Sequence, residues 1–240
     1  INEGDGFRLK VLGIDTSTLM STCAVLDGDR LIGEYSLSQD MSHSEKLVPM
    51  VKEVLDSLKL TINDIDLFSV AKGPGSFTGL RIGIATMKAF AHLTDKPIIG
   101  VSTLEALAYN LPYNEIVVPM IDARRERVYT AIFKWEGTSL ETIMEPCVLE
   151  VDKLLDRLNS NHEKIVVNGD GSAVFKERIK DRLKDKVQFS TIGQNMSRAS
   201  SICELALLKY GRGQVDDFYT LAPDYLLETQ AQRELRERGK

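Results

Sequence analysis

Carboxyl and hydroxyl side chains follow the first apolar segment of the chain, where Asp15, Thr16 and Ser17 come directly after Val11 to Ile14. An acidic residue and hydroxyls at the end of a buried strand can orient the metal ion and the phosphates of a nucleotide. The same residue types also form Asx and Ser/Thr turns between strands. Without further information, the residue types favour the turn.

A glycine-rich loop runs from Gly73 to Gly79 and contains three glycines, a proline and two hydroxyl residues. Backbone amides in such a loop can bind a phosphate at the start of a helix. The loop is neither a P-loop, because no Lys-Ser/Thr pair follows in register, nor a G-x-G-x-x-G motif. A tight turn that lets a helix approach a neighbouring backbone is the alternative, and the sequence leaves both interpretations open.

Metal and nucleophile chemistry have little support in the sequence. Its three histidines and three cysteines show no metal-ligand spacing: His43, His92, His162, Cys23, Cys147 and Cys203. We expect the histidines on the surface, and the scattered cysteines fit a reducing cytosol. A Ser-His-Asp triad stays open because its members need not be adjacent, although no G-x-S-x-G motif supports one.

Length and charge narrow the function classes. The 240 residues suffice for one large domain or two small lobes, and no apolar run is long enough to span a membrane. The net charge of -5 disfavours a stand-alone nucleic-acid binder. The only local basic group, Arg124, Arg125 and Arg127, is expected to be a solvated turn. We exclude Ile1 to Phe7 from the prediction of the fold and expect a cytoplasmic protein.

The elements that must position these residues alternate between strands and helices. The first half predicts strands at Val11–Asp15, Thr22–Leu26, Leu31–Ser36, Leu67–Ala71 and Pro97–Val101, with helices at Glu45–Leu58, from the glycine loop to Thr94, and from Ser102 to Asn110. Capping boxes open two of these helices, at Ser42 and Ser102, although Pro49 would lie inside the first.

The second half repeats this order more loosely. It predicts strands at Ile116–Ile121, Val128–Trp135, Glu145–Glu150, Lys164–Asn168 and Val187–Ser190, with helices at Asp152–Leu158, Ala173–Leu183 and Ser197–Tyr210. Two β-β-β-α-β-α-type halves predict an α/β protein of two lobes whose sheets are mostly parallel beyond the opening hairpin. We expect lobes at residues 8–110 and 111–227, followed by a charged tail at 228–240.

The helix after the glycine loop is apolar almost all round. Leu80, Ile84, Met87 and Ala91 fall on one face, and Ile82, Ala85, Ala89 and Leu93 fall on the opposite face. Such a helix must be buried on more than one side, either inside the chain or by a partner. The partner interpretation predicts an interface at Val48, Met50, Leu55, Gly79, Ile82, Gly83, Thr86 and Phe90, where the two glycines would let a second backbone approach.

Several of these segments together resemble one family. Val11 to Ser17, the helix start from His43 to Pro49, Gly73 to Arg81, and Ile121 to Arg125 resemble the TsaB family, formerly YeaZ. The resemblance extends from about Leu9 to Leu226 and implies an actin-like fold of the acetate kinase/Hsp70/actin type. It departs from the pattern at Leu227, where relatives often have Arg.

The resemblance implies a scaffold in the formation of threonylcarbamoyladenosine. In that family, the paralogue TsaD transfers the threonylcarbamoyl group to the adenosine beside the anticodon of tRNAs that read codons beginning with A. The resemblance implies that this chain pairs with TsaD through its first two helices, supports the ATPase TsaE, forms a homodimer when alone, and meets tRNA only through the complex. Thr103 and Leu107 stand where TsaD has metal-binding histidines, which implies that the chain is not an enzyme.

The resemblance also implies a degenerate nucleotide site. Asp15 with Thr16 and Ser17, then Asp122, and then the Gly169-Asp170-Gly171 turn resemble the two phosphate loops and the adenosine loop of actin-like ATPases. We therefore expect no required cofactor and weak binding of ATP or ADP. The alternative function is an active ATP-dependent phosphotransferase in which Asp15 orients the metal. A metallopeptidase is a third, which the histidines disfavour.

Overall fold

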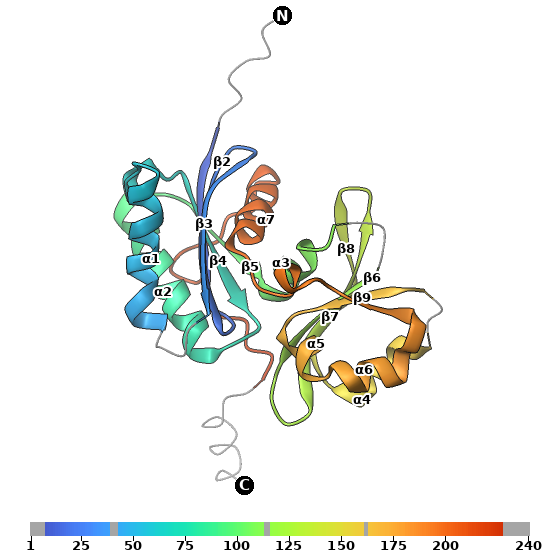
Figure 1. Ribbon diagram of the computed structural model, residues 1–240. Coiled ribbons are helices and arrows are strands. Elements are labelled where there is room, and N and C mark those ends of the chain that lie inside the picture. The colour runs from blue at the N-terminus through green and yellow to red at the C-terminus, as the bar shows by residue number, and fades with distance from the viewer. Residues whose placement is uncertain (1–7, 39–42, 113–115, 161–162, 228–240) are drawn as a thin grey trace, which may run out of the picture.

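The computed structural model describes residues 8–38, 43–112, 116–160 and 163–227, with side chains of helix α1 described from Lys46 onward. In these ranges the chain forms two five-stranded sheets flanked by helices, which give the two lobes of Figure 1. The predictions for Ser42, His162, the His43 side chain and the tail at 228–240 fall outside what is described. Among the described residues, no helix is long and apolar enough to cross a lipid bilayer.

The first sheet has the order β3-β2-β1-β4-β5. Its strands are β1 (Lys10–Asp15), β2 (Met20–Asp27), β3 (Arg30–Ser38), β4 (Leu67–Gly73) and β5 (Ile98–Ser102). The first three strands are antiparallel, whereas β4 and β5 run parallel to β1. This pattern confirms the predicted opening hairpin and parallel extension, because helical crossovers connect the later strands.

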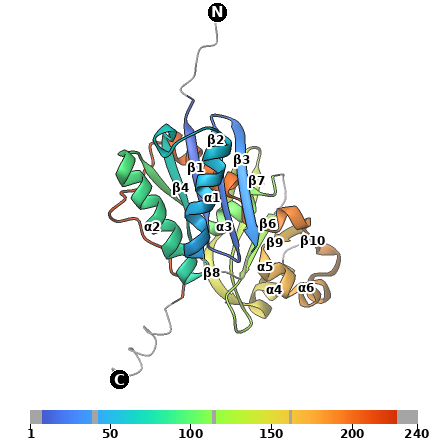
Figure 2. The same cartoon turned by 60° about the vertical axis from the view of Figure 1, so that its left-hand side comes forward.

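Helices α1 (His43–Ser57) and α2 (Phe77–Thr94) lie side by side on one face of this sheet, with the short helix η1 (Ile62–Asp64) between them in sequence (Figure 2). Their buried side chains pack on Leu12, Ile14, Phe68 and Val70 of the strands. Pro49 lies within α1. The Ser76 side chain caps α2 by accepting a hydrogen bond from the amide of Gly79.

The second sheet repeats the pattern in the order β10-β9-β6-β7-β8. Its strands are β6 (Ile116–Asp122), β7 (Arg127–Glu136), β8 (Ser139–Glu150), β9 (Ile165–Asn168) and β10 (Val187–Phe189), and its helices are α4 (Val151–Asn159), α5 (Asp170–Val174) and α6 (Lys176–Leu183), with short η2 (Lys184–Lys186) and η3 (Ile192–Gln194). The single helix predicted at 173–183 is wrong, because the helix starts earlier and breaks at Phe175, which packs against the core of this lobe.

Each half also contributes one helix to the sheet of the other half. Helix α3 (Thr103–Tyr109) packs on the second sheet, where Leu104 and Leu107 meet Val117 and Phe133. Helix α7 (Ala199–Gly211) packs on the first sheet, where Cys203 leaves no room for a side chain at Gly13. The strands of each sheet come from one predicted half, whereas α3 and α7 each pack on the sheet of the other half. The domain boundary at residue 110 stays a prediction.

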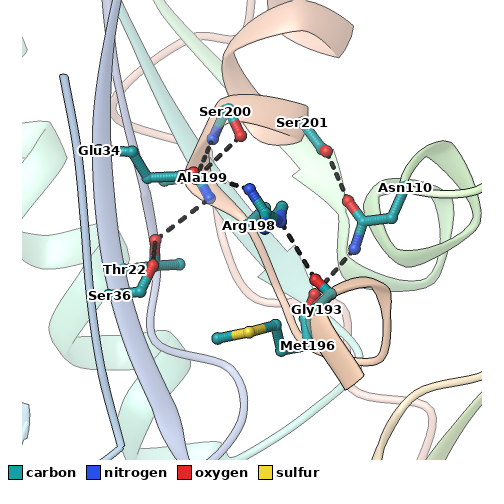
Figure 3. Close-up of polar contacts among 10 residues, drawn as sticks. All are labelled: Thr22, Glu34, Ser36, Asn110, Gly193, Met196, Arg198, Ala199, Ser200 and Ser201. Atoms are coloured by element: carbon teal, nitrogen blue, oxygen red, sulfur yellow. Dashed lines mark hydrogen bonds and ion pairs between the residues drawn. The ribbon is translucent and has the colours of Figure 1, made fainter. Parts of the chain in front are cut away.

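A polar cluster fixes the start of α7 against the first lobe (Figure 3). The Glu34 carboxylate on β3 accepts hydrogen bonds from the backbone amide of Ser200 at 3.1 Å and its hydroxyl at 2.8 Å, and it lies 3.2 Å from Arg198 Nη1. Thr22 Oγ1 accepts from the amide of Ala199 at 3.3 Å. A carboxylate at a helix N-terminus stabilises the unpaired amides there, so the first lobe caps a helix of the second half.

The last described segment returns to the first lobe. The Asp216 amide donates to the Ile98 carbonyl at 3.0 Å, and the Asp216 carboxylate accepts from the Gly100 amide at 2.8 Å. Lys88 Nζ of α2 donates to the carbonyls of Tyr219 and Leu221, each at 3.2 Å. The segment therefore covers the edge of β5 and contacts α2 at Lys88.

Candidate functional site

The turn after β1 is held together by its own side chains. Asp15 is fully buried, and its Oδ1 accepts a hydrogen bond from the Ser17 amide at 2.7 Å. Thr16 is also buried, and its hydroxyl donates to the Gly79 carbonyl at 2.8 Å. These contacts form the Asx-type turn that the residue types favoured. Asp15 and Thr16 hold the turn from the buried side, while Ser17 lines the cleft between the two halves that is described below.

The glycine loop packs directly on this turn. The Ser76 amide donates to the Ser17 carbonyl at 2.6 Å. A Cβ atom at Gly75 would overlap the Ser17 carbonyl oxygen, and one at Gly79 would overlap that of Thr16. Of the two open interpretations, the geometry supports the close approach of a helix rather than a free phosphate cradle.

The second half supplies Asp122 at the end of β6 and Asp170 at the start of α5. The Asp122 amide donates to Asp170 Oδ1 at 3.1 Å, and Asp122 Oδ1 accepts from the Arg124 amide at 2.8 Å. Burial raises the pKa of Asp170, although hydrogen bonds from the amides of Asp122 and Gly171 oppose the shift. Side chains at Gly169 and Gly171 would collide with the backbone of Met120.

The predicted turn at Gly169-Asp170-Gly171 is therefore partly a helix start. Gly169 has φ +87° and precedes α5, and Asp170 is the first residue of that helix. The glycines are required by the close contact with β6, which the sequence could not show because Met120 lies far away along the chain.

The residues Arg124, Arg125 and Glu126 form a left-handed turn between β6 and β7, with φ of +61°, +53° and +59°. Asp122 holds this turn through the Arg124 amide, and its Oδ2 lies 3.4 Å from Arg124 Nη1. Both arginines are exposed. The prediction of a solvated basic turn is confirmed for them, and the run of three positive φ angles explains why Asp122 must anchor it.

The two halves meet across a cleft of about 320 Å³, which we name the motif cleft. One wall consists of the β1–β2 turn and the glycine loop, and the other of β6, β7 and α5; its polar lining includes Ser17, Thr18, Ser76, Asp122, Arg124, Tyr129 and Asp170. Three residues of the candidate nucleotide site, Ser17, Asp122 and Asp170, thus lie around one cleft. Asp15, Thr16, Gly169 and Gly171 support them from behind.

The described histidine and the other described ligand-type residues do not converge. His92 is exposed on α2, with its ring 5.2 Å from that of Phe218. Thr103 and Leu107 are buried in α3. Within the part of the chain that the structure describes, no three His, Cys, Asp or Glu residues are grouped so as to hold a metal ion.

Of the residues predicted to form the partner surface, some are accessible and others are buried in the core. Val48 is exposed on α1, and Ile82, Thr86 and Phe90 are half-buried on α2. Met50 and Leu55 are buried in the core between helix and sheet. The outer face of α2 also exposes Ala85, Ala89 and Leu93, so these residues, rather than the two core residues, continue the apolar surface.

The role predicted for Gly79 and Gly83 is wrong. Both face inward, where a Cβ at Gly83 would lie 2.6 Å from Thr16 Oγ1. Their spacing lets α2 approach its own β1–β2 turn, not a second chain. The i, i+4 pattern was read correctly as a close approach, but a sequence cannot say on which side of a helix the neighbouring backbone lies.

Comparison with known proteins identifies close relatives of this arrangement. Residues 30–234 match the family model described as TsaD, tRNA N6-adenosine threonylcarbamoyltransferase. The tRNA threonylcarbamoyladenosine biosynthesis protein TsaB of Bacillus subtilis is 32% identical over 225 residues, which cover 93% of this chain and 96% of that protein.

Solved structures agree with the sequence matches. YeaZ from Pseudomonas aeruginosa superposes with a TM-score of 0.77 at 26% identity, covering 91% of this chain and all of that one (100%). The activator of 2-hydroxyisocaproyl-CoA dehydratase from Clostridium difficile has a TM-score of 0.54 at 10% identity, covering 87% and 99% of the two chains. The latter likeness concerns the fold alone, and it agrees with the actin-like architecture.

Proposed function

The chain belongs to the TsaB family, and from this membership we propose that it is the non-catalytic subunit on which a TsaD transferase depends for threonylcarbamoylation of tRNA. In this proposal TsaD carries out the transfer to the adenosine beside the anticodon. The present chain binds TsaD and supports the recruitment of TsaE.

One observation carries the proposal: the outer face of α1 and α2 is apolar and exposed. Leu93 is 75% exposed and Val48 is 48% exposed, and Ala85 and Ala89 lie exposed on the same side of α2. Small and branched apolar side chains on two adjacent helices form a surface suited to helix packing. We propose that TsaD covers this face, and that a second copy of the chain covers it when TsaD is absent, as a two-fold contact.

A non-catalytic role fits the interior of the protein. The turn and loop that resemble phosphate loops are bound to each other through Thr16, Ser17 and Ser76. Thr103 and Leu107, which the resemblance aligns with the metal-binding histidines of TsaD, are buried. Neither a threonine hydroxyl nor a leucine side chain is a useful ligand for a transition metal.

Reconstitution tests the proposed role. Purified protein should not modify tRNA by itself, and it should restore modification when it is added to TsaD, TsaE, the adenylate-forming enzyme, ATP, threonine and bicarbonate. Modified nucleoside is measured by mass spectrometry after digestion of the tRNA. Modification in a mixture where this chain replaces TsaD would contradict the proposal.

A pair of matched variants tests the surface. Ala89→Glu places a charge on the outer face of α2, whereas Ala173→Glu makes the same change at an exposed helical alanine of the second lobe. Burying an unpaired carboxylate in an interface is costly, so only Ala89→Glu should abolish binding to TsaD and restoration of modification. Equal binding by both variants would place the interface elsewhere.

The second candidate is an ATP-dependent phosphotransferase, favoured by the convergence of Ser17, Asp122 and Asp170 in the motif cleft. Isothermal titration with ATP and magnesium separates the two candidates. The scaffold proposal expects weak or no binding and no hydrolysis, together with tight binding to TsaD. Tight binding with turnover would favour the phosphotransferase.

A further inference from the structure

Arg81 of α2 borders the exposed apolar face of that helix. It is itself exposed, and Ala85, which belongs to the apolar face, lies one helical turn further along the chain. Residues four apart are neighbours on a helix surface. A partner that covers the outer face of α2 therefore also meets Arg81.

Two aromatic rings hold the Arg81 guanidinium in place. Its carbon Cζ lies 4.0 Å from the centroid of the Phe77 ring and 5.9 Å from that of the Tyr225 ring. The two rings are themselves stacked, with centroids 4.9 Å apart and planes at 27°. A guanidinium is attracted electrostatically to the face of an aromatic ring, so these contacts restrict the rotamers of Arg81.

A hydrogen bond fixes the orientation of the same guanidinium. Arg81 Nε donates to the Tyr225 hydroxyl at 2.9 Å. Tyr225 is placed in turn by the residue before it, because the Asp224 amide donates to the Lys72 carbonyl at 2.7 Å and Asp224 Oδ2 lies 3.2 Å from Lys72 Nζ. The last described segment thus sets the direction of the guanidinium.

The two terminal nitrogens of Arg81 have no acceptor within the described parts of the chain, and no acidic side chain there pairs with them. Arg178 and Arg198, by contrast, each pair with a glutamate. Two parallel N–H groups match the geometry of a carboxylate. Because the rings and the Tyr225 hydroxyl already order the side chain, binding a carboxylate costs little further conformational entropy.

The surroundings of Arg81 favour a protein carboxylate over a phosphate of nucleic acid. The net charge of the chain is -5, which opposes binding to a phosphate backbone. The neighbouring face with Ala85 and Ala89 is apolar and exposed, as at the edge of a protein interface.

The charges of α2 also distinguish between two kinds of partner. The ionisable side chains of this helix are Arg81, Lys88 and His92, and none is acidic. In a two-fold contact the same surface occurs on both sides, so two copies that pack α2 against α2 bring these basic groups near one another. Like charges across an interface cost free energy. A carboxylate of TsaD opposite Arg81 removes that cost.

We propose that Arg81 binds a carboxylate side chain of TsaD at the edge of the apolar interface, and that this ion pair favours TsaD over a second copy of the chain. Tyr225 is the positioning residue, because it orients the guanidinium before the partner arrives. This assignment rests on the scaffold function proposed above and adds the charged contact that selects the partner.

One variant tests both assemblies. Arg81→Gln should weaken binding to immobilised TsaD in surface plasmon resonance by roughly ten- to a hundredfold, as expected when one member of an interfacial ion pair is removed. Self-association in sedimentation equilibrium should stay the same or become tighter. Arg212→Gln is the control and should change neither, because Arg212 is exposed at the end of α7, on the other side of the first sheet (Figure 1). Unchanged binding to TsaD in Arg81→Gln, or equal weakening of both assemblies, would overturn the proposal.

The positioning role of Tyr225 has its own test. Tyr225→Phe keeps the ring and deletes the hydroxyl, and it should weaken TsaD binding by roughly two- to tenfold while circular dichroism shows the native fold. Tyr210→Phe on α7 is the matched control and should bind normally. The double variant of Arg81→Gln and Tyr225→Phe should bind no more weakly than Arg81→Gln alone, because both changes remove one contact. Additive losses would refute the positioning role.

Salt and one further variant separate a failure of this ion pair from a failure of the scaffold function. Salt screens ion pairs, so the affinity of the unmodified chain for TsaD should fall more steeply with ionic strength than that of Arg81→Gln; equal slopes would contradict the ion pair. If Ala89→Glu abolishes TsaD binding and Arg81→Gln leaves it unchanged, the scaffold function stands and the ion pair is wrong. If neither variant weakens binding, the interface lies elsewhere and both proposals fail.

Discussion

Both faces of helix α2 are apolar, but the chain buries only one of them. The inner face, with Leu80, Ile84, Met87 and Ala91, is buried against the first sheet. The outer face, with Ala85, Ala89 and Leu93, remains exposed. Hydrophobicity alone therefore does not show which face of an all-apolar helix the chain covers itself.

The two faces of α2 differ in how closely a neighbouring backbone approaches them. Gly79 and Gly83 lie on the inner side, where Thr16 approaches the helix backbone. Between the two faces, Lys88 Nζ donates hydrogen bonds to the carbonyls of Tyr219 and Leu221 in the last described segment. Changes on the inner face should therefore alter stability, and changes on the outer face should alter association.

The largest contrast should come from leucine introduced on each face. Gly83→Leu must displace Thr16, and its Cβ would also lie 3.6 Å from side-chain atoms of Ile14 and Val70. We expect a loss of about 3 kcal/mol or more in the free energy of unfolding by overpacking. Ala85→Leu, on the exposed face, should change it by less than about 0.5 kcal/mol. Urea denaturation measures both, and similar stabilities would show that the inner face has room.

A single methyl group tests the closest contact of the inner face. Gly79→Ala should cost about 1–3 kcal/mol, because its Cβ would overlap the Thr16 carbonyl oxygen. The matched control is Gly211→Ala at the end of α7, where no atom lies within 4 Å of an added Cβ. It should be neutral or slightly stabilising, by up to about 1 kcal/mol. In thermal unfolding, the melting temperature of Gly79→Ala should fall, and that of Gly211→Ala should stay the same or rise slightly.

Much of the fold could be predicted from periodicity. Strands and helices alternate visibly, and the Asp15 and Asp122 turns end equivalent strands in the two halves. The exchange of α3 and α7 between the sheets could not be predicted, because Leu107 and Cys203 look like ordinary core residues wherever their helices pack. The break at Phe175 was missed for the same reason.

The residues of the candidate nucleotide site could be named from sequence, but the part that each plays in the structure could not. Ser17, Asp122 and Asp170, which the resemblance had placed in one nucleotide site, line one cleft. That Gly169 and Gly171 serve contact with Met120 depends on a pairing of distant segments. Glu34 gave no signal at all, since a carboxylate on an edge strand looks solvent-exposed until a helix N-terminus is placed against it.

A smaller effect should follow from removing the hydroxyl that joins the inner face to the turn. Thr16→Val keeps the shape of the side chain and deletes the hydrogen bond to the Gly79 carbonyl. We expect a loss of about 0.5–1.5 kcal/mol. Thr86 is half-buried towards the outer face. The same substitution there, Thr86→Val, is the control and should leave the free energy of unfolding nearly unchanged. If Thr16→Val leaves the free energy of unfolding in urea unchanged, close packing at the glycines is enough to hold the turn.

The smallest effect on stability should come from the most exposed apolar residue of the outer face. Leu93→Ser removes a side chain that is 75% exposed, so the free energy of unfolding should change by no more than about 0.5 kcal/mol. Leu208→Ser on α7 is the control, because Leu208 is also an exposed helical leucine, at 45%. If the outer face pairs two copies, Leu93→Ser should weaken self-association in sedimentation equilibrium and Leu208→Ser should not. The reverse result would move the association surface to α7, while equal weakening by both would show nonspecific apolar association rather than a defined interface.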